Sequence, residues 1–397
     1  MKVLMISPNF PFPPNDGGKI VIYNFYKYFK KSGHEVDFIC TSKTPVALEQ
    51  RIAFDPDKIP DPYFDSKISS YSRILKNLLL RRSALIYKFY SRGFLKIIMD
   101  KAASGDYDLL HFESLHSVPY ALKLSKAMKD KKIVVRMHNI ESQIVYRFFK
   151  VAKNPVLKLF LYNEYKLMKK VEKQCYRELK NVAFITEEDM KMAQKENSQE
   201  LNPYVMTAGV DIGYFSNLDG ATSQSLLYLG SMDWKPNEDA VLWFIKNVFS
   251  ELLETYPDLK FYVVGKNPSE RMKNQASPNI IVTGTVEDVR PYVEKSGICV
   301  IPLRVGGGMR VKILELMASG KPIITSTIGA EGIDYESGKD LLIADSSEDF
   351  IREIKNLLGN QDKIRSIGIN ARQKVKQLYS WESVISGYLK YLRGTVL

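Results

Sequence analysis

A run of three glycines, Gly306–Gly308, precedes two cations, Arg310 and Lys312, and one acid, Glu315. Glycines let a backbone approach a ligand closely, and a helix starting here offers free N–H groups and its positive dipole end. Two cations in a first helical turn oppose that dipole, a conflict that a bound phosphate would remove. Glu315 shares a helix face with Lys312, where a carboxylate can accept both hydroxyls of a ribose. The segment is a candidate nucleotide diphosphate site; the alternative, a flexible turn before a solvated helix face, stays open.

A glycine pair, Gly17 and Gly18, lies between the first predicted strand and its helix. A helix that begins with glycines is again a geometry that binds anions. The alternative is a tight turn in which Asp16 is an ordinary N-cap.

His138 follows a predicted strand, within the segment Arg136–Glu141. Imidazole at this position could donate to a sugar hydroxyl or to a leaving phosphate. The alternative is a packed or surface histidine. His111 and His116 flank Glu113, but the sequence shows no further ligand nearby, so we predict no metal site.

Composition places the chain among ordinary globular proteins. Its 397 residues are 45% hydrophobic and 26% charged, which suggests two or three domains. The three cysteines lie far apart without a C-x-x-C pair, which argues against a disulfide framework and fits a reducing cytoplasm. The N-terminal segment lacks the features of a signal peptide, and no apolar run is long enough to span a bilayer.

The net charge of +12 is confined to the first half of the chain. Residues 1–200 hold 35 Lys and Arg against 22 Asp and Glu, a net +13, whereas residues 201–397 hold 22 against 23, a net −1. The excess is concentrated in residues 67–101, with nine basic residues and one acid, and in residues 147–180, with ten and three. These segments could face an anionic membrane, or they could be the solvated faces of packed helices. No nucleic-acid-binding module is recognised, so we expect no nucleic-acid partner.

Both halves alternate strands and helices. Strands are predicted over 3–7, 35–40, 109–113, 133–137, 182–186, 225–232, 261–265, 280–284, 298–303 and 322–326, and helices over 17–31, 237–256, 287–296 and 309–319. Apolar residues from Leu157 to Leu179 form one further stripe with helical spacing. Short β-branched strands separated by helices predict parallel sheets covered on both faces, with ligands at the carboxyl ends of the strands.

Several motifs resemble glycosyltransferase family 4, which has the GT-B fold. The matching segments are ISPNFPFPPNDGG, HNIE, TAGVDIGYF, YLGSMDWKPNEDAVLWF, VVG, VTGTVEDVRPYV, VIPLRVGGGMRVKILELMASGKPIITSTIGAEGI and SWESV. The resemblance covers nearly the whole chain. It implies an α/β chain with two Rossmann-like parallel-sheet domains facing a cleft: an acceptor domain over 1–205, a nucleotide-sugar domain over 206–380, and a C-terminal helix over 381–397 that returns to the first domain.

The resemblance also implies roles for individual residues. Glu315 would hold the donor ribose, and Gly307, Gly308, Met309 and Arg310 would meet the diphosphate and sugar. Gly17 and Gly18 would approach the same phosphates, Thr285 and Val286 would line the base, and His138 would be the active-site histidine.

Two features depart from the family pattern. Gly307 stands where the family has a glutamate that contacts the donor sugar. Ser231 stands at an arginine position, and Pro236-Asn237 replaces Lys-Gly. Arg310 and Lys312 are then the expected diphosphate cations, with Lys235 as a further candidate.

The expected function is transfer of a sugar from a UDP-sugar or GDP-sugar to an acceptor hydroxyl, with retention of configuration and without a metal. The acceptor would be a lipid-linked or surface-polysaccharide glycan, and the protein would be cytoplasmic, peripheral at the inner face of the cell membrane. The alternatives are a nucleotide-sugar 2-epimerase and a non-catalytic sugar-nucleotide-binding protein.

Overall fold

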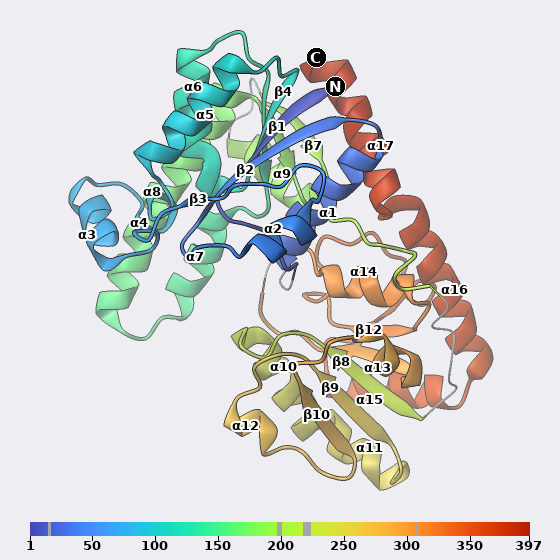
Figure 1. Ribbon diagram of the computed structural model, residues 1–397. Coiled ribbons are helices and arrows are strands. Elements are labelled where there is room, and N and C mark those ends of the chain that lie inside the picture. The colour runs from blue at the N-terminus through green and yellow to red at the C-terminus, as the bar shows by residue number, and fades with distance from the viewer. Residues whose placement is uncertain (15–16, 197–200, 217–223, 307) are drawn as a thin grey trace. The chain divides into compact units, whose positions relative to one another are not determined.

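The computed structural model describes residues 1–14, 17–196, 201–216, 224–306 and 308–397. The chain divides into two units: unit 1 comprises Met1–Thr207 and Val384–Leu397, and unit 2 comprises Ala208–Ser383. Each unit is built on a parallel sheet with helices packed against it (Figure 1). The predicted pair of Rossmann-like α/β domains is therefore confirmed.

Unit 1 contains a seven-stranded parallel sheet in the order β3-β2-β1-β4-β5-β6-β7. Its strands are β1 (Lys2–Ser7), β2 (Glu35–Ser42), β3 (Tyr63–Phe64), β4 (Leu109–Glu113), β5 (Ile133–Met137), β6 (Asn181–Phe184) and β7 (Asn202–Val205). The central strands β4 and β5 are buried along their whole length. Such double-sided burial explains why these strands show no alternation of apolar and polar residues, and it places His111, Glu113 and Arg136 in the interior.

Helices surround this sheet. They are α1 (Gly17–Lys31), α2 (Leu48–Phe54), α3 (Tyr71–Leu79), α4 (Ala84–Tyr87), α5 (Arg92–Ser104), α6 (Val118–Ala127), α7 (Glu141–Val151), α8 (Pro155–Leu179) and α9 (Glu187–Glu196), with a short 3₁₀ turn at Leu115–Ser117. The last helix, α17 (Trp381–Tyr391), continues as a π-helical turn at Leu392–Val396. Its Tyr388 is fully buried in unit 1, where the ring packs on Phe25 of α1.

Unit 2 contains a six-stranded parallel sheet in the order β10-β9-β8-β11-β12-β13. The strands are β8 (Ser225–Leu229), β9 (Lys260–Val264), β10 (Ile280–Gly284), β11 (Ile298–Ile301), β12 (Ile323–Thr325) and β13 (Leu342–Ile343). The helices are α10 (Lys235–Phe244), a π-helical segment (Ile245–Phe249), α11 (Ser250–Thr255), α12 (Glu270–Lys273), α13 (Arg290–Lys295), α14 (Val311–Ala318), α15 (Ser347–Leu358) and α16 (Gln361–Leu378). One apolar core joins the sheet to these helices.

Two expected helices of unit 2 differ in detail. The single helix expected over 237–256 begins earlier, at Lys235, and contains the π-helical segment. The helix expected from Met309 begins at Val311. Gly306 and Gly308 have φ of +145° and +77°, values that lie outside the right-handed helical region. The helix begins only after Arg310, which is its N-cap instead of a first-turn residue.

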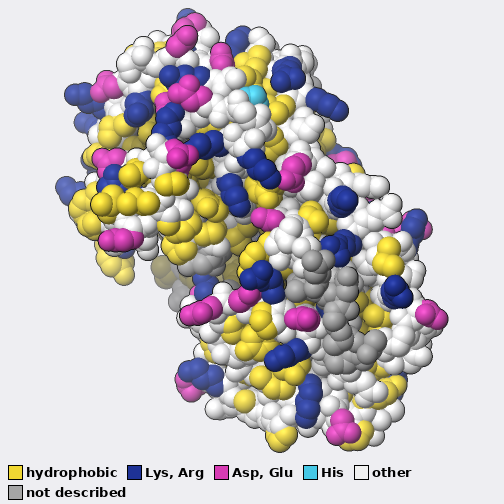
Figure 2. Space-filling view, turned by 45° about the vertical axis from the view of Figure 1, so that its right-hand side comes forward, with side chains coloured by type: hydrophobic (Ala, Val, Ile, Leu, Met, Phe, Trp, Pro, Cys, Tyr) yellow, Lys and Arg dark blue, Asp and Glu magenta, His cyan; other side chains and the backbone are white. Residues whose placement is uncertain are grey.

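The apolar stripe of α8 is only partly a core face. Met168, Val171, Cys175 and Leu179 are buried against the sheet of unit 1. Leu157, by contrast, is 49% exposed, so the stripe leaves the core at its N-terminal end. Figure 2 shows hydrophobic side chains gathered at the outer edge of unit 1 among Lys and Arg.

None of the helices within the described ranges is both long enough and apolar enough to cross a lipid bilayer.

Helix α16 holds α14 in place through a close backbone approach. A Cβ atom on Gly368 would collide with the carbonyl oxygen of Gly320, the residue that ends the α14 segment with a φ of +75°. We predict that Gly368→Ala lowers the free energy of unfolding by about 1–3 kcal/mol because backbone must move. Each 1 kcal/mol shifts the melting temperature by roughly 2–4 °C in a domain of this size.

Calorimetry of Gly359→Ala supplies the matched control. A Cβ there makes only an ordinary contact, 3.7 Å from the carbonyl oxygen of Lys355. Equal melting temperatures for the two variants would contradict the proposed close approach.

Candidate active site

The strand order of unit 2 reverses direction between β8 and β11. In open α/β sheets, ligands bind outside the carboxyl ends of the strands at such a reversal. The loops that leave this edge are residues 230–234 after β8 and residues 302–310 after β11. The candidate donor residues Ser231, Arg310 and Lys312 lie on or directly after these loops.

Lys312 extends from α14 to the end of β8. Its Nζ donates to Tyr228 Oη at 3.0 Å and to Asn237 Oδ1 at 2.9 Å. The Tyr228 hydroxyl itself donates to Asn237 Oδ1 at 2.6 Å, which fixes both partners. A Cβ atom on Gly230 would come within 2.9 Å of Lys312 Nζ and 3.0 Å of Asn237 Nδ2, so glycine here leaves room for both side chains. The lysine is thus positioned by three separate elements, β8, α10 and α14.

The two charges of α14 are held in an environment with little water. Burial lowers the pKa of Lys312 to about 7, and the neighbouring Arg310 acts in the same direction, against the opposing effect of Glu315. Burial raises the pKa of Glu315 to about 7, partly offset by Lys312. An ammonium ion in this position lacks full compensation, and a bound diphosphate would favour its charged form.

Arg310 lies against the aromatic ring of Trp234. Its side chain is 7% exposed, and its guanidinium carbon is 5.3 Å from the Trp234 ring centroid. A Cβ on Gly306 would collide with the guanidinium, so glycine at 306 leaves room for this arrangement. Met309 directs part of its side chain to the core of unit 2, and Gly307 lies outside the described residues.

The other predicted donor residues of unit 2 are Ser231, Lys235, Thr285 and Val286. The Ser231 hydroxyl donates to Asp233. Lys235 is 82% exposed and pairs with Glu238 at 2.8 Å. Thr285 and Val286 follow β10, which is two strands away from β8 in the sheet, and Val286 packs against the core. The structure therefore brings Arg310 and Lys312 together at the reversal, whereas Thr285 and Val286 follow the edge strand.

In unit 1, the predicted glycine pair opens α1. Gly17 and Gly18 are both exposed, and a Cβ on Gly17 would meet no atom within 4 Å. Packing therefore does not require glycine at position 17. Asp16, the alternative N-cap, lies outside the described residues.

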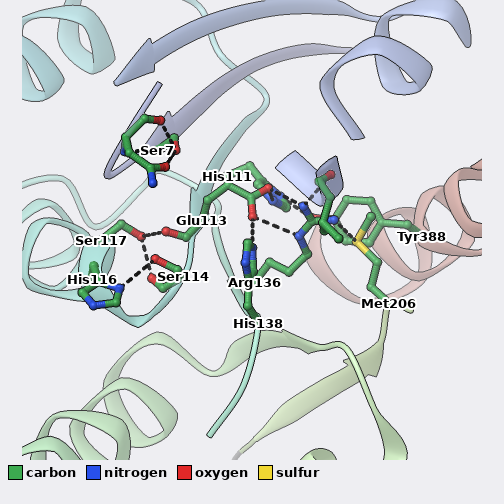
Figure 3. A network of polar contacts seen from close by, with 12 residues as sticks. Ser7, His111, Glu113, Ser114, His116, Ser117, Arg136, His138, Met206 and Tyr388 are labelled. Carbon is green, nitrogen blue, oxygen red and sulfur yellow. Dashed lines mark hydrogen bonds and ion pairs between the residues drawn. The ribbon is translucent and has the colours of Figure 1, made fainter. Parts of the chain in front are cut away.

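His138 lies at the end of β5 and is anchored to a buried carboxylate (Figure 3). Its Nε2 is 2.7 Å from Glu113 Oε2. Burial opposes the charge of Glu113, but Arg136, His111 and His138 together hold its pKa well below the usual range. Because Glu113 is ionised and can only accept, Nε2 of His138 must donate to it. In a neutral ring Nδ1 is then an acceptor, whereas an imidazolium would also donate from Nδ1, as expected from the sequence.

Glu113 is the centre of a wider buried network. Its Oε1 accepts from Arg136 at 2.9 Å and from His111 Nε2 at 3.0 Å. His111 Nδ1 is 2.8 Å from the hydroxyl of Tyr388, which ties α17 to β4. The Arg136 guanidinium also lies 4.6 Å from the ring centroid of Phe25. All of these groups are fully or almost fully buried.

The sequence reasoning did not assign Glu113 and Arg136 to the site. A signal was present, because the two residues are directly paired in the register of β4 and β5. Opposite charges at the same level of adjacent buried strands indicate an ion pair. His116 is linked to Glu113 indirectly: its Nδ1 is 3.4 Å from Ser114 Oγ, and the Ser117 hydroxyl contacts the backbone oxygens of Ser114 and Glu113. Burial lowers the pKa of His116 to about 3. In the described ranges, no cluster of three or more His, Cys, Asp or Glu could hold a metal ion.

Comparison with protein families matches both units. The model named Glycosyltransferase Family 4 matches residues 15–199, and the model named Glycosyl transferases group 1 matches residues 223–360. The chain is a glycosyltransferase of the GT-B fold.

Relatives span the whole enzyme. A curated protein of Klebsiella pneumoniae, described as an uncharacterized 44.6 kDa protein in the cps region, is 24% identical over 98% of this glycosyltransferase and 99% of its own length. The MMP alpha-(1->4)-mannosyltransferase of Mycolicibacterium hassiacum is 21% identical over 93% and 92% of the two chains. The solved structure of Anabaena Alr3699/HepE in complex with UDP and glucose has a TM-score of 0.70 at 13% identity, covering 99% of this chain and 100% of that one.

The buried lysine generates a stability prediction for the unliganded glycosyltransferase. The folded pKa of Lys312 is lowered, so its cost to stability is full below about pH 7 and declines as pH rises toward the unfolded value. We expect Lys312→Met to raise the melting temperature by several degrees at pH 6, since roughly 1 kcal/mol corresponds to 2–4 °C. The gain should shrink at pH 9.

Scanning calorimetry of the two proteins at both pH values measures this difference. A lower melting temperature for Lys312→Met at pH 6 would show that the ammonium is already well compensated by Tyr228 and Asn237.

In the Glu113 network, removal of a charge is expected to lower stability. Glu113→Gln leaves the buried charge of Arg136 without its counterion, which typically costs about 3–5 kcal/mol. The melting temperature should therefore fall strongly. Glu187→Gln is the control, because the Glu187–Lys191 pair is exposed and worth at most about 0.5 kcal/mol. A Glu113 variant as stable as this control would refute the central role of Glu113.

Proposed function

We propose that this glycosyltransferase moves a sugar from a UDP-sugar or GDP-sugar to an acceptor hydroxyl. The observation that carries the proposal is the convergence of Arg310, Lys312 and Glu315 at the point where the strand order of unit 2 reverses. The UDP and glucose bound by the Anabaena structure support a nucleoside-diphosphate donor. The mannosyltransferase activity of the mycobacterial relative supports a hexose as the transferred group.

The chemistry follows from the charges. Breaking the anomeric C–O bond leaves negative charge on the departing diphosphate. Preorganised cations and N–H groups that face this charge lower the barrier, and such electrostatic stabilisation is usually the largest catalytic contribution. Arg310, Lys312 and the N-terminus of α14 supply it, so the proposal includes no metal. Glu315 accepts the ribose hydroxyls, and the family resemblance implies retention of the anomeric configuration.

His138 is the candidate active-site residue of unit 1. Glu113 holds its Nε2, which orients the ring and leaves Nδ1 available to accept from a sugar hydroxyl. Gly17 and Gly18 offer backbone N–H groups to a phosphate. These assignments place one set of donor contacts on each unit.

The acceptor is proposed to be a lipid-linked or surface-polysaccharide glycan at the cytoplasmic face of an anionic membrane. The support is the charge of +13 on residues 1–200. Basic residues near an anionic surface each contribute about 1 kcal/mol to binding.

Two alternatives are separable from this proposal. A nucleotide-sugar 2-epimerase would convert the donor without any acceptor, so incubating the donor alone and analysing for an epimer distinguishes it. A non-catalytic binding protein would release no nucleoside diphosphate with any pair of substrates. Thermal-shift measurements with a panel of nucleotide-sugars identify the base and sugar, since a ligand of the folded state raises the melting temperature.

The proposed site predicts large losses of activity. Arg310→Ala and Glu315→Ala should each reduce turnover by roughly 10²-fold or more, the magnitude of comparable electrostatic contributions. Lys246→Ala, on an exposed position of the π-helical segment, serves as the control. Release of nucleoside diphosphate from the donor identified by thermal shift is the assay. Near-normal turnover in both site variants would exclude this site.

A further inference from the structure

Two segments of unit 1 expose apolar side chains that the fold does not use. Helix α3 presents Tyr71, Leu75 and Leu79, at intervals of four residues and therefore on one face, with exposed fractions of 92%, 59% and 77%. Leu80, directly after the helix, is also exposed. A helix face this apolar would normally be covered.

The turn that joins α7 to α8 is similar. We call it the hairpin tip. Its exposed apolar residues are Phe148, Val151, Val156, Leu157 and Leu159, each at least 49% exposed. Isolated exposed leucines need no explanation, but a cluster marks a surface that meets another apolar phase.

The two apolar segments are held close together by a buried carboxylate. Glu164 of α8 accepts from Ser83 Oγ at 2.7 Å and from the backbone N–H of Ala84 at 2.9 Å. These residues begin α4 and follow Leu80 by only a few positions. The C-terminal end of α3 is therefore fixed beside the second and third turns of α8. Both segments lie at the left of unit 1 in Figure 1, where α3 is labelled.

All charged residues in the sequence around these segments are basic. Residues 66–99 and 142–163 contain no Asp or Glu. Seven exposed cations flank the apolar side chains: Lys76, Arg81, Arg82, Arg147, Lys150, Lys153 and Lys158.

 The face of α8 that carries Val156 and Leu159 continues toward the C-terminus. It carries Lys166, Lys170, Lys173 and Arg177.

A groove of about 590 Å³ lies along this basic face. It is lined by Tyr165, Lys166, Lys169, Lys170, Lys173, Gln174 and Arg177. Its charge suits phosphate-bearing head groups, because five of its seven lining residues are Lys or Arg. Helix α8 therefore presents an apolar end followed by a phosphate-binding stretch.

We propose that α3 and the hairpin tip form a docking surface for an anionic lipid bilayer, in which the apolar side chains enter the interface and the surrounding cations contact head groups. This combination is what interfacial membrane binding requires: apolar burial plus attraction to anionic lipid. Lys and Arg can keep their charges among the head groups while their methylene chains lie beside the leucines. The inference deepens the proposed function, because a membrane-bound acceptor is what would make this surface useful, and in that respect it rests on the proposed function. Its test requires no catalytic activity.

The surface differs from what other anionic partners would need. A single-stranded nucleic acid would need cations interleaved with aromatic rings on which bases stack, whereas most exposed apolar residues here are Leu and Val. A second copy of this chain would bring another cationic surface against this one. Charge complementarity therefore favours the anionic bilayer.

Flotation of the full chain with vesicles tests the proposal. The vesicles contain phosphatidylcholine alone, or phosphatidylcholine and phosphatidylglycerol in equal amounts. We expect binding to the anionic vesicles that weakens but persists in about 1 M salt, where charges are screened beyond roughly 3 Å. Absence of binding at low salt, or binding abolished completely by high salt, would overturn the insertion of apolar side chains.

Paired substitutions locate the surface. Leu75→Ser with Leu79→Ser, and Val156→Ser with Leu159→Ser, should each reduce vesicle partitioning roughly tenfold or more, from the apolar area withdrawn from lipid. The control pair is Ile369→Ser with Leu378→Ser, which are also exposed, at 56% and 45%, but lie on α16 of unit 2. Equal binding by all three pairs would refute the assignment.

Two further measurements separate the possible failures. Leu79→Trp should show a blue shift of its fluorescence when anionic vesicles are added, and an unchanged spectrum would contradict insertion. Light scattering of the wild-type protein reports its oligomeric state: a dimer that the Leu75/Leu79 pair converts to a monomer would overturn the lipid assignment in favour of self-association. Melting temperatures and nucleotide binding of all variants show that the fold and the donor site are intact, so loss of lipid binding is distinct from failure of the proposed function.

Discussion

The placement of a lysine ammonium among buried groups at the end of β8 governs the candidate donor site. Glycine at position 230 leaves room for the Lys312 ammonium, and Tyr228 and Asn237, which hydrogen-bond to each other, both accept from it. Neither partner carries a negative charge, so the ammonium is hydrogen-bonded but not neutralised. The lowered pKa expresses this deficit. A site with an unneutralised cation is less stable alone than with an anion, and the sheet reversal is where an anion can reach it.

In unit 1, by contrast, a buried cation is neutralised by a charged group of the protein itself. Its buried cation, Arg136, faces a buried anion, Glu113, and two histidines and a tyrosine complete the remaining hydrogen bonds. Such a network is compensated without any ligand, and it is rigid because its hydrogen bonds join β4, β5 and α17. His138 benefits from this rigidity, since its ring orientation is set before any substrate arrives. A fully paired network thus positions a reactive group, whereas an incompletely paired one binds a ligand.

Local patterns predicted most of the elements, and long-range pairing limited the rest. The helix at Gly17–Lys31 has the predicted bounds, because its apolar residues repeat with helical spacing over several turns. The start of α14 was placed too early, since the conformation of Gly306 and Gly308 is not encoded in their neighbours. The ion pair of Glu113 and Arg136 requires the register of β4 against β5, which a linear reading of the chain does not supply.

The structure also divides the excess charge of the first half into two kinds. Some cations are used within the fold: Lys30 pairs with the buried Asp55, and Arg73 pairs with Asp65. Lys76 of α3 and the cations of the hairpin tip lie in stretches without any acid, so neighbouring residues in the sequence cannot neutralise them. Net charge by itself therefore says little about a partner; what matters is where acids are missing. Here they are missing where leucines and valines are exposed, and an anionic apolar interface is the phase that meets both conditions at once.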